Sequence, residues 1–125
     1  WVPGGNSFFA NFVRDAGGDY VFNNDSFESL PYTIEQVFAT ASDAEIWLHP
    51  NEMTTHSQIL NVDSRLESFP PYTNARIYNN NKICSPSGGS DFWESGILHP
   101  DIVLEDLRNI FSGTDDTLTY YRRLY

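Results

Sequence analysis

Three histidines and a single cysteine are the side chains of this sequence best suited to binding a metal or attacking a substrate. His49, Glu52 and His56 fall within one short stretch and offer the nitrogen and oxygen ligands that zinc prefers. Pro50, however, interrupts any helix that would align them. A histidine at a strand end beside a proline is more often an exposed residue than a ligand. We therefore predict no metal site.

Covalent catalysis has no recognisable nucleophile in this chain. Cys84 is the only cysteine, and a free cysteine is more often a small buried hydrophobe. No nucleophile elbow or glycine-rich phosphate loop is present. The turn Gly4-Gly5-Asn6-Ser7 could present backbone N–H groups to an anion, although a tight turn explains the glycines more simply. The sequence therefore indicates a protein that is not an enzyme, with Asn6 as a candidate ligand contact.

Aromatic side chains gather at the ends of predicted loops and are the stronger binding signal. Such side chains could line a cleft for a large, partly apolar ligand, or they could pack into the core. The sequence leaves both alternatives open. The residues concerned are Phe22, Phe27, Tyr32, Tyr78, Phe92 and Trp93.

Length and charge exclude several classes of protein. The 125 residues, 40% of them hydrophobic, are enough for one compact domain with a core. Seventeen acidic against seven basic residues give a formal charge of −10, so a nucleic-acid partner is not expected. No apolar run approaches the ~20 residues that a membrane span needs. The chain also opens without methionine or a leader pattern, which predicts an excised or mature fragment.

Helices and short strands alternate along the chain. A helix is expected from Asn6-Ser7 to Gly17-Gly18, and another after Thr33, with a capping box to Gln36. The remaining elements are predicted helices at 55–61 and 100–111, a helical turn at 63–69 stopped by Pro70-Pro71, a second capping box at Asp91 and Glu94, and strands at 19–22, 44–48 and 76–78.

This alternation predicts an α/β fold, a three-layer Rossmann-like lobe whose small, mostly parallel sheet is flanked by helices. Residues 1–125 would form that single lobe, and the 117–125 tail has no assigned form. Ligands of such sheets gather at the carboxyl ends of the strands. In this chain those ends are the loops after Phe22, Leu48 and Tyr78.

The order of motifs resembles the substrate-binding proteins of ABC importers for iron siderophores, haem and cobalamin. Three stretches carry the resemblance, which is closest to Bacteroidetes-type members of iron transport. They are Val2-Pro3-Gly4-Gly5-Asn6-Ser7 leading to Ala16-Gly17-Gly18, Thr33-Ile34-Glu35-Gln36-Val37 leading to Asp43-Ala44-Glu45-Ile46-Trp47-Leu48, and Asp91-Phe92-Trp93-Glu94-Ser95-Gly96 leading to Pro100. The resemblance implies the C-terminal lobe of a two-lobe protein, with the N-terminal lobe and the interlobe helix absent from this chain.

The same resemblance implies roles for individual residues. Glu35 matches the glutamate that docks on arginines of the membrane permease, and a carboxylate in a first helical turn is favoured by the helix dipole. Trp93, Phe92 and Asp91 match the segment that contacts ligand in the family. Glu94 could serve either docking or ligand contact. Asn6 and Tyr78 complete the candidate ligand-binding residues.

The expected function is therefore that of a periplasmic or extracytoplasmic binding protein, anchored through an N-terminal lipid outside this chain. It would carry an iron chelate, a siderophore or haem, to the permease by closure of two lobes. A cobalamin or corrinoid ligand is the alternative within the family, although Ser95 stands where cobalamin binders can carry a basic residue. A periplasmic sensor or adaptor, or a small α/β hydrolase-like enzyme, is the rival from another class.

Overall fold

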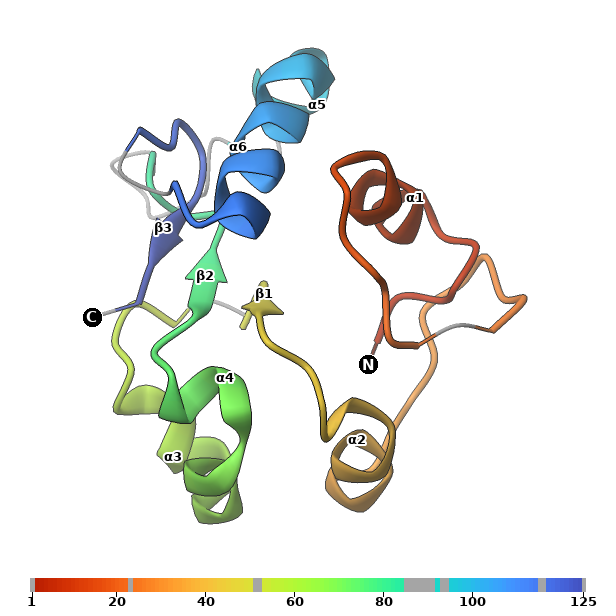
Figure 1. The fold of residues 1–125 in the computed structure, drawn as a ribbon, viewed down its shortest axis with the longest axis vertical. Coiled ribbons are helices and arrows are strands. Elements are labelled where there is room, and N and C mark those ends of the chain that lie inside the picture. Colours follow the sequence, from red (N-terminus) through yellow and green to blue (C-terminus); the bar gives the residue numbers. More distant parts are fainter. Residues whose placement is uncertain are drawn as a thin grey trace.

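The computed structural model describes residues 2–22, 24–50, 53–84, 92, 95–114 and 117–124. They form a small mixed α/β unit in which short helices surround a three-stranded sheet (Figure 1). The termini of the chain lie on opposite sides of β1 in this view. The elements follow the predicted alternation in outline, but the sheet is shorter and is assembled differently.

The first two helices begin at side-chain caps. Helix α1 (Phe8–Asp15) starts after Ser7, whose Oγ accepts a hydrogen bond from the Ala10 N–H. Helix α2 (Ile34–Ala41) starts after Thr33, and both hydrogen bonds of the capping box with Gln36 are present. These caps satisfy N–H groups that have no partner within the helix. The predicted capping box at Thr33 is thus confirmed.

A compact helical segment follows, formed by α3 (Gln58–Val62), the 3₁₀ helix η1 (Ser64–Ser68) and α4 (Pro70–Thr73). The predicted helical turn before the prolines is present as η1. The prolines do not simply end that turn, because they also occupy the first turn of α4. A helix tolerates proline there, since its missing N–H would have no intrahelical partner.

Helix α5 (Ser95–Leu98) is short, whereas α6 (Pro100–Ser112) is the longest helix among the described residues. Proline at its first position and Gly113 after its end, with φ of 84°, mark the boundaries expected from the sequence. Its apolar face is buried through Val103, Leu107 and Ile110. Figure 1 shows α6 beside the sheet, with α1 on its other side.

The sheet contains one parallel and one antiparallel pair. Strand β1 (Trp47–Leu48) pairs in parallel with β2 (Ile77–Asn79), which pairs antiparallel with β3 (Arg122–Arg123). The order is β1-β2-β3. The C-terminal tail therefore supplies an edge strand that the sequence did not predict, and the sheet is mixed rather than mostly parallel.

The strand predicted at 19–22 is wrong, because this segment has an irregular conformation. Side chains hold it instead of a sheet ladder. The Tyr20 hydroxyl donates to the Pro3 carbonyl at 2.6 Å, and the Tyr20 ring contacts those of Phe9 and Phe22 at centroid distances of 6.5 and 6.0 Å. The only bridge of this region joins Val2 to Leu30 among the described residues.

Two hydrophobic clusters meet at β2, because successive strand residues point to opposite faces. Tyr78 belongs to the cluster with α6, and Ile77 to the cluster with α2, α3 and η1. Leu48 and Trp47 of β1 divide between the clusters in the same way. No helix of the described residues has the length and apolar character needed to cross a membrane.

Candidate functional site

Phe92 is the one residue of the predicted Asp91–Glu94 ligand segment whose position is described. Asp91, Trp93 and Glu94 lie outside the described residues. Phe92 is half-buried, and its ring contacts those of His49, Tyr120 and Tyr121 at centroid distances of 5.6, 6.4 and 5.8 Å. Phe92 therefore contacts the carboxyl end of β1, where His49 directly follows the strand.

His49 is the centre of an aromatic cluster that we define by His49, Phe9, Phe92 and Tyr121. Its Nε2 lies 2.6 Å from the Tyr121 hydroxyl oxygen, and the two rings are stacked within 17° of parallel. Phe9 of α1 closes the cluster at a centroid distance of 4.5 Å. Burial lowers the pKa of His49 to about 4. The imidazole is thus neutral near pH 7, where it can exchange a hydrogen bond with Tyr121 but carries no charge.

His49 also has a left-handed backbone conformation, with φ of 59°. Only a few per cent of non-glycine residues adopt positive φ, and such residues need support from their surroundings. Here the ring contacts and a 3.0 Å hydrogen bond from the His49 N–H to the Tyr78 carbonyl provide that support. The prediction that His49 is simply an exposed strand-end residue is wrong, because it is half-buried and binds Tyr121, which is 72 positions away in the chain.

The other half of the predicted histidine motif has separate partners. His56 stacks on Tyr72 at 3.9 Å, and its Nε2 lies 2.8 Å from the Tyr72 carbonyl oxygen. Glu52 lies outside the described residues. Within the described part of the chain, no group of three or more histidine, cysteine or acidic side chains is arranged to hold a metal ion.

Tyr78 lies in the core rather than on a loop. Its side chain is fully buried, and its hydroxyl accepts hydrogen bonds from Nε and Nη2 of Arg123 at 3.2 and 2.8 Å. Arg123 also lies over the Tyr78 ring, 5.4 Å from its centroid. This residue therefore joins β2 to β3, and a ligand at the surface of the chain would not reach it.

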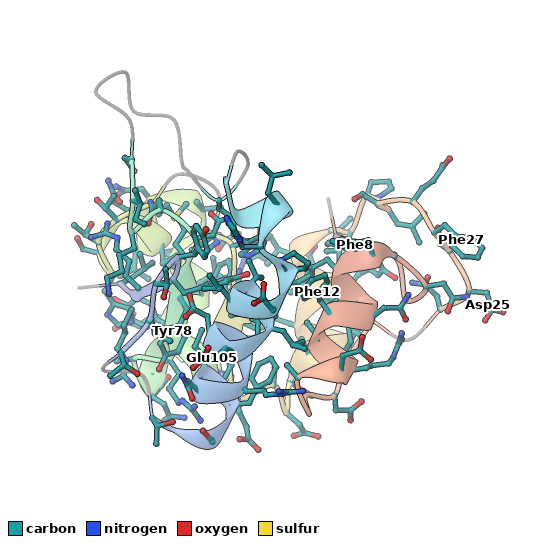
Figure 2. The ribbon with its side chains drawn as sticks, turned by 90° about the horizontal axis from the view of Figure 1, so that it is seen from above. Phe8, Phe12, Asp25, Phe27, Tyr78 and Glu105 are labelled. Atoms are coloured by element: carbon teal, nitrogen blue, oxygen red, sulfur yellow. The ribbon has the colours of Figure 1, made fainter. Side chains whose placement is uncertain are left out.

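Asn6 belongs to a turn whose N–H groups bind the chain itself. The Gly5 N–H donates to Asn24 Oδ1, the Asn6 N–H donates to the Ser26 carbonyl, and Asn6 Nδ2 donates to the Asp25 carbonyl. A Cβ added to Gly5 would lie 2.1 Å from the Asn24 carbonyl oxygen. Glycine here lets the backbone of this turn approach the backbone at Asn24 closely. This agrees with the interpretation that the glycines form a tight turn rather than an anion site. Figure 2 shows the loop with Asp25 and Phe27 at the end of the molecule far from Tyr78.

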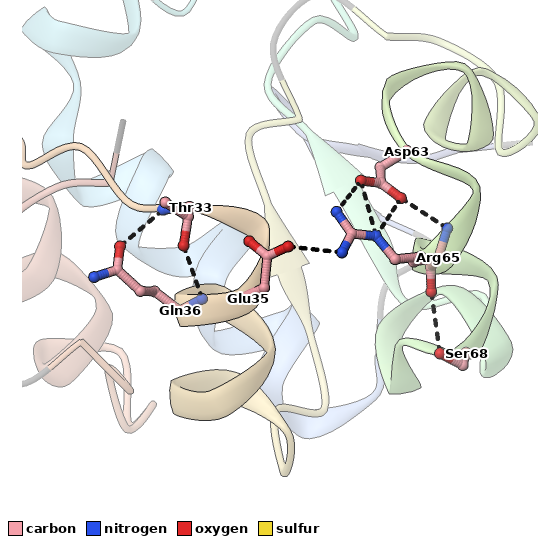
Figure 3. A network of polar contacts seen from close by, with 6 residues as sticks. All are labelled: Thr33, Glu35, Gln36, Asp63, Arg65 and Ser68. Atoms are coloured by element: carbon pink, nitrogen blue, oxygen red, sulfur yellow. Dashed lines mark hydrogen bonds and ion pairs between the residues drawn. The ribbon is translucent and has the colours of Figure 1, made fainter.

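Glu35 lies in the first turn of α2, with its side chain 69% exposed. Its Oε1 accepts an ion-paired hydrogen bond of 2.8 Å from Nη1 of Arg65, which also binds Asp63 (Figure 3). We call these three residues the Glu35–Arg65–Asp63 network. The hydrogen bond from Arg65 lowers the pKa of Glu35, and the Arg65 contacts lower that of Asp63 to about 2. Both carboxylates are therefore charged near pH 7, and the network carries a net charge of about −1.

Asp106 is a structural residue that the sequence did not single out. It is 1% exposed, on α6, and its carboxylate accepts hydrogen bonds from the backbone N–H groups of Thr119, Tyr120 and Tyr121. These bonds fix the segment that leads into β3 and bring Tyr121 to His49. A lone aspartate within an amphipathic helix gives no sequence signal for such a role, because its partners are backbone groups more than ten residues away.

Comparison with known proteins identifies one distant relative and no family. The chain is 28% identical over 112 residues, or 88% of its length, to an uncharacterized lipoprotein of Methanocaldococcus jannaschii. This match spans 25% of the relative, so the chain covers about a quarter of that protein's length. No protein-family model matches the chain, and no solved structure matches it.

Proposed function

We propose that this chain is the C-terminal lobe of the substrate-binding protein of an ABC importer, and that it holds an iron chelate, a siderophore or haem, against a second lobe. The observation that carries the proposal is the exposed Glu35 carboxylate in the first turn of α2, at the position that matches the family's docking glutamate. A charged, exposed carboxylate can bind an arginine of the permease in a bidentate manner. The excess of acidic residues in the chain as a whole would speed the encounter with a basic rim.

The fold and the relative support this assignment. Hydrophobic clusters on both faces of β2 are what a three-layer Rossmann-like lobe requires. The name of the relative, a lipoprotein about four times as long as the matched stretch, favours a lipid-anchored, extracytoplasmic protein with further domains. The ligand would contact Phe92 at the carboxyl end of β1. Asp91 and Trp93, which lie outside the described residues, remain ligand contacts implied by the family resemblance alone. Phe92 and Phe9 would form the apolar floor there.

Charge reversal at Glu35 tests the docking role. In the full-length protein, Glu35→Arg is expected to bind chelate normally yet to reduce uptake at least about tenfold, because it would place like charges at the permease contact. The matched control is Glu105→Arg, which makes the same change of charge at an exposed position on α6. Titrations with a ferric hydroxamate, a ferric catecholate, haemin and cyanocobalamin would identify the ligand, and radiolabelled uptake in cells with the permease and ATPase would measure transport.

The two measurements separate the alternatives. A corrinoid carrier would bind cyanocobalamin in preference to the iron chelates. A sensor or adaptor would bind a ligand without supporting uptake in the unmodified protein. Loss of chelate affinity in Glu35→Arg, or uptake equal to that of Glu105→Arg, would contradict the docking role.

A further inference from the structure

In the Glu35–Arg65–Asp63 network, Asp63 makes more hydrogen bonds with the Arg65 guanidinium than Glu35 does. Nε of Arg65 lies 3.0 and 3.2 Å from the two Asp63 oxygens, and Nη2 lies 2.7 Å from Oδ2. Only Nη1 reaches Glu35. Asp63 thus binds one whole edge of the guanidinium, whereas Glu35 binds a single N–H group at its end (Figure 3).

Asp63 is itself fixed by the backbone. It is the N-cap of η1, and its Oδ1 accepts a hydrogen bond of 2.9 Å from the Arg65 N–H. Its side chain is 18% exposed, against 69% for Glu35. Asp63 and Arg65 are two positions apart, whereas Glu35 is 30 positions away on another helix. The Asp63–Arg65 pair is therefore a local unit that does not need Glu35 to keep its geometry.

Such an arrangement allows Glu35 to exchange partners at little cost. A solvent-exposed ion pair is weak, because water screens it and ordering long side chains costs entropy. When another cation takes Glu35, the charge of Arg65 remains compensated by Asp63. A guanidinium is the best partner for Glu35, since its planar fork can bind both oxygens of a carboxylate, as Arg65 now does with Asp63. The electrostatics thus favour a replaceable contact at Glu35 and a permanent one at Asp63.

We propose that Arg65 is an intramolecular competitor for the permease: it occupies Glu35 in the undocked protein, and an arginine of the permease displaces it on docking. This inference rests on the proposed docking role of Glu35. Competition by Arg65 weakens the docked complex and lets the binding protein leave after it has delivered its ligand. Arg65 then stays on Asp63, ready to return to Glu35.

The test uses the full-length protein and its permease in nanodiscs, with the dissociation constant measured by biolayer interferometry. Arg65→Gln is expected to tighten docking about two- to fivefold, the range set by the strength of an exposed ion pair. Arg108→Gln is the matched control, because Arg108 is an exposed residue of α6 and the change of net charge is the same. Arg65→Lys keeps the charge without the fork, and is expected to tighten docking less than Arg65→Gln.

A measurement without permease checks the same contact. NMR titration of the Glu35 carboxyl should show a higher pKa in Arg65→Gln than in the unmodified protein, because the hydrogen bond from Arg65 is lost. The Arg108→Gln control should leave that pKa where it is. An unchanged Glu35 pKa in Arg65→Gln would overturn the proposed competition.

The variant Glu35→Gln separates the competitor role of Arg65 from the docking role of Glu35, on which the competitor role depends. If Glu35→Gln does not weaken docking, the proposed function fails at this site. If Glu35→Gln weakens docking but Arg65→Gln weakens it too, or tightens it no more than Arg108→Gln, only the competitor role fails. Competition also requires that the gain from Arg65→Gln disappear in the double variant with Glu35→Gln, as in a double-mutant cycle of coupled residues.

Discussion

His49 combines a positive φ, a half-buried ring and a short hydrogen bond to Tyr121, and so it links distant parts of the chain. Phe9 brings α1 to it, and Tyr121 brings the segment before β3. A left-handed histidine costs of order 1–3 kcal/mol unless its surroundings favour it. The aromatic contacts, together with the hydrogen bond from the His49 N–H to the Tyr78 carbonyl, therefore favour this conformation at the carboxyl end of β1.

The stability of this unit should consequently depend on pH through His49. Its pKa is about 4 in the folded protein and about 6.5 when unfolded, so the unfolded chain binds more protons between these values. The contribution of neutral His49 to the free energy of unfolding is fully present above the unfolded pKa, and it is lost as the pH falls from that value toward the folded pKa. Between about pH 7 and pH 5 the loss should approach 2 kcal/mol. The opening free energy of β2 amides, from hydrogen exchange of the full-length protein, measures it.

His49→Phe supplies the control for this pH dependence. Phenylalanine keeps an aromatic ring in the cluster but cannot be protonated, and it leaves the Tyr121 hydroxyl without its imidazole partner. The variant should be less stable near pH 7, yet its stability should change little between about pH 7 and pH 5. An unaltered pH dependence in the variant would show that another group is responsible.

At the scale of elements, the segment 117–124 completes both the sheet and the core. It supplies β3, and Tyr121 and three further residues of the segment are buried. Those residues are Leu118, Tyr120 and Leu124. Asp106 holds the segment because its carboxylate accepts hydrogen bonds from the backbone N–H groups of three successive residues, 119–121. A buried carboxylate is tolerated where several donors satisfy it. Helix α6 thus fixes, through Asp106, the segment that leads into a strand of only two residues.

Asp106→Asn should therefore loosen the C-terminal segment more than its small change in shape suggests. The amide presents one acceptor oxygen instead of two, and its NH₂ group would face backbone N–H donors. We expect a loss of about 2–4 kcal/mol in the opening free energy of the Tyr120 and Tyr121 amides. Asp101→Asn is the control, since Asp101 is exposed on the same helix. Equal exchange rates in the two variants would contradict the anchoring role.

The elements that sequence predicts well are those with local causes. The caps of α1 and α2 and both boundaries of α6 follow from Ser7, Thr33, Pro100 and Gly113. Strand β3 and the aromatic cluster have non-local causes, since they depend on Asp106 and His49 meeting the tail. Two-residue strands are also too short for an alternating pattern to mark them. The exposed position of Glu35 was predictable, but its pairing with Arg65 across 30 residues was not.

At the scale of the whole molecule, two hydrophobic clusters pack against opposite faces of a narrow sheet. Each face of β2 contributes a large side chain to a different cluster, and β1 does the same. Both faces of the sheet are thereby covered, while Phe8, Phe27 and Leu98 remain about three-quarters exposed, at 77%, 78% and 76%. Single exposed apolar side chains are common on protein surfaces, so these residues do not by themselves mark a contact surface.

The two-lobe proposal makes a final prediction about the chain in isolation. A lobe that supplies half of a binding site loses the contacts of the other half and the closure that encloses the ligand, so affinity should fall steeply. We expect the isolated 125-residue chain to bind the ferric siderophore or haemin preferred by the full-length protein at least about 100-fold more weakly. Calorimetric titration measures both affinities, and protected amides in β2 and α6 by hydrogen exchange establish that the isolated chain is folded. Equal affinities would place the whole site on this lobe and remove the need for a partner lobe in ligand binding.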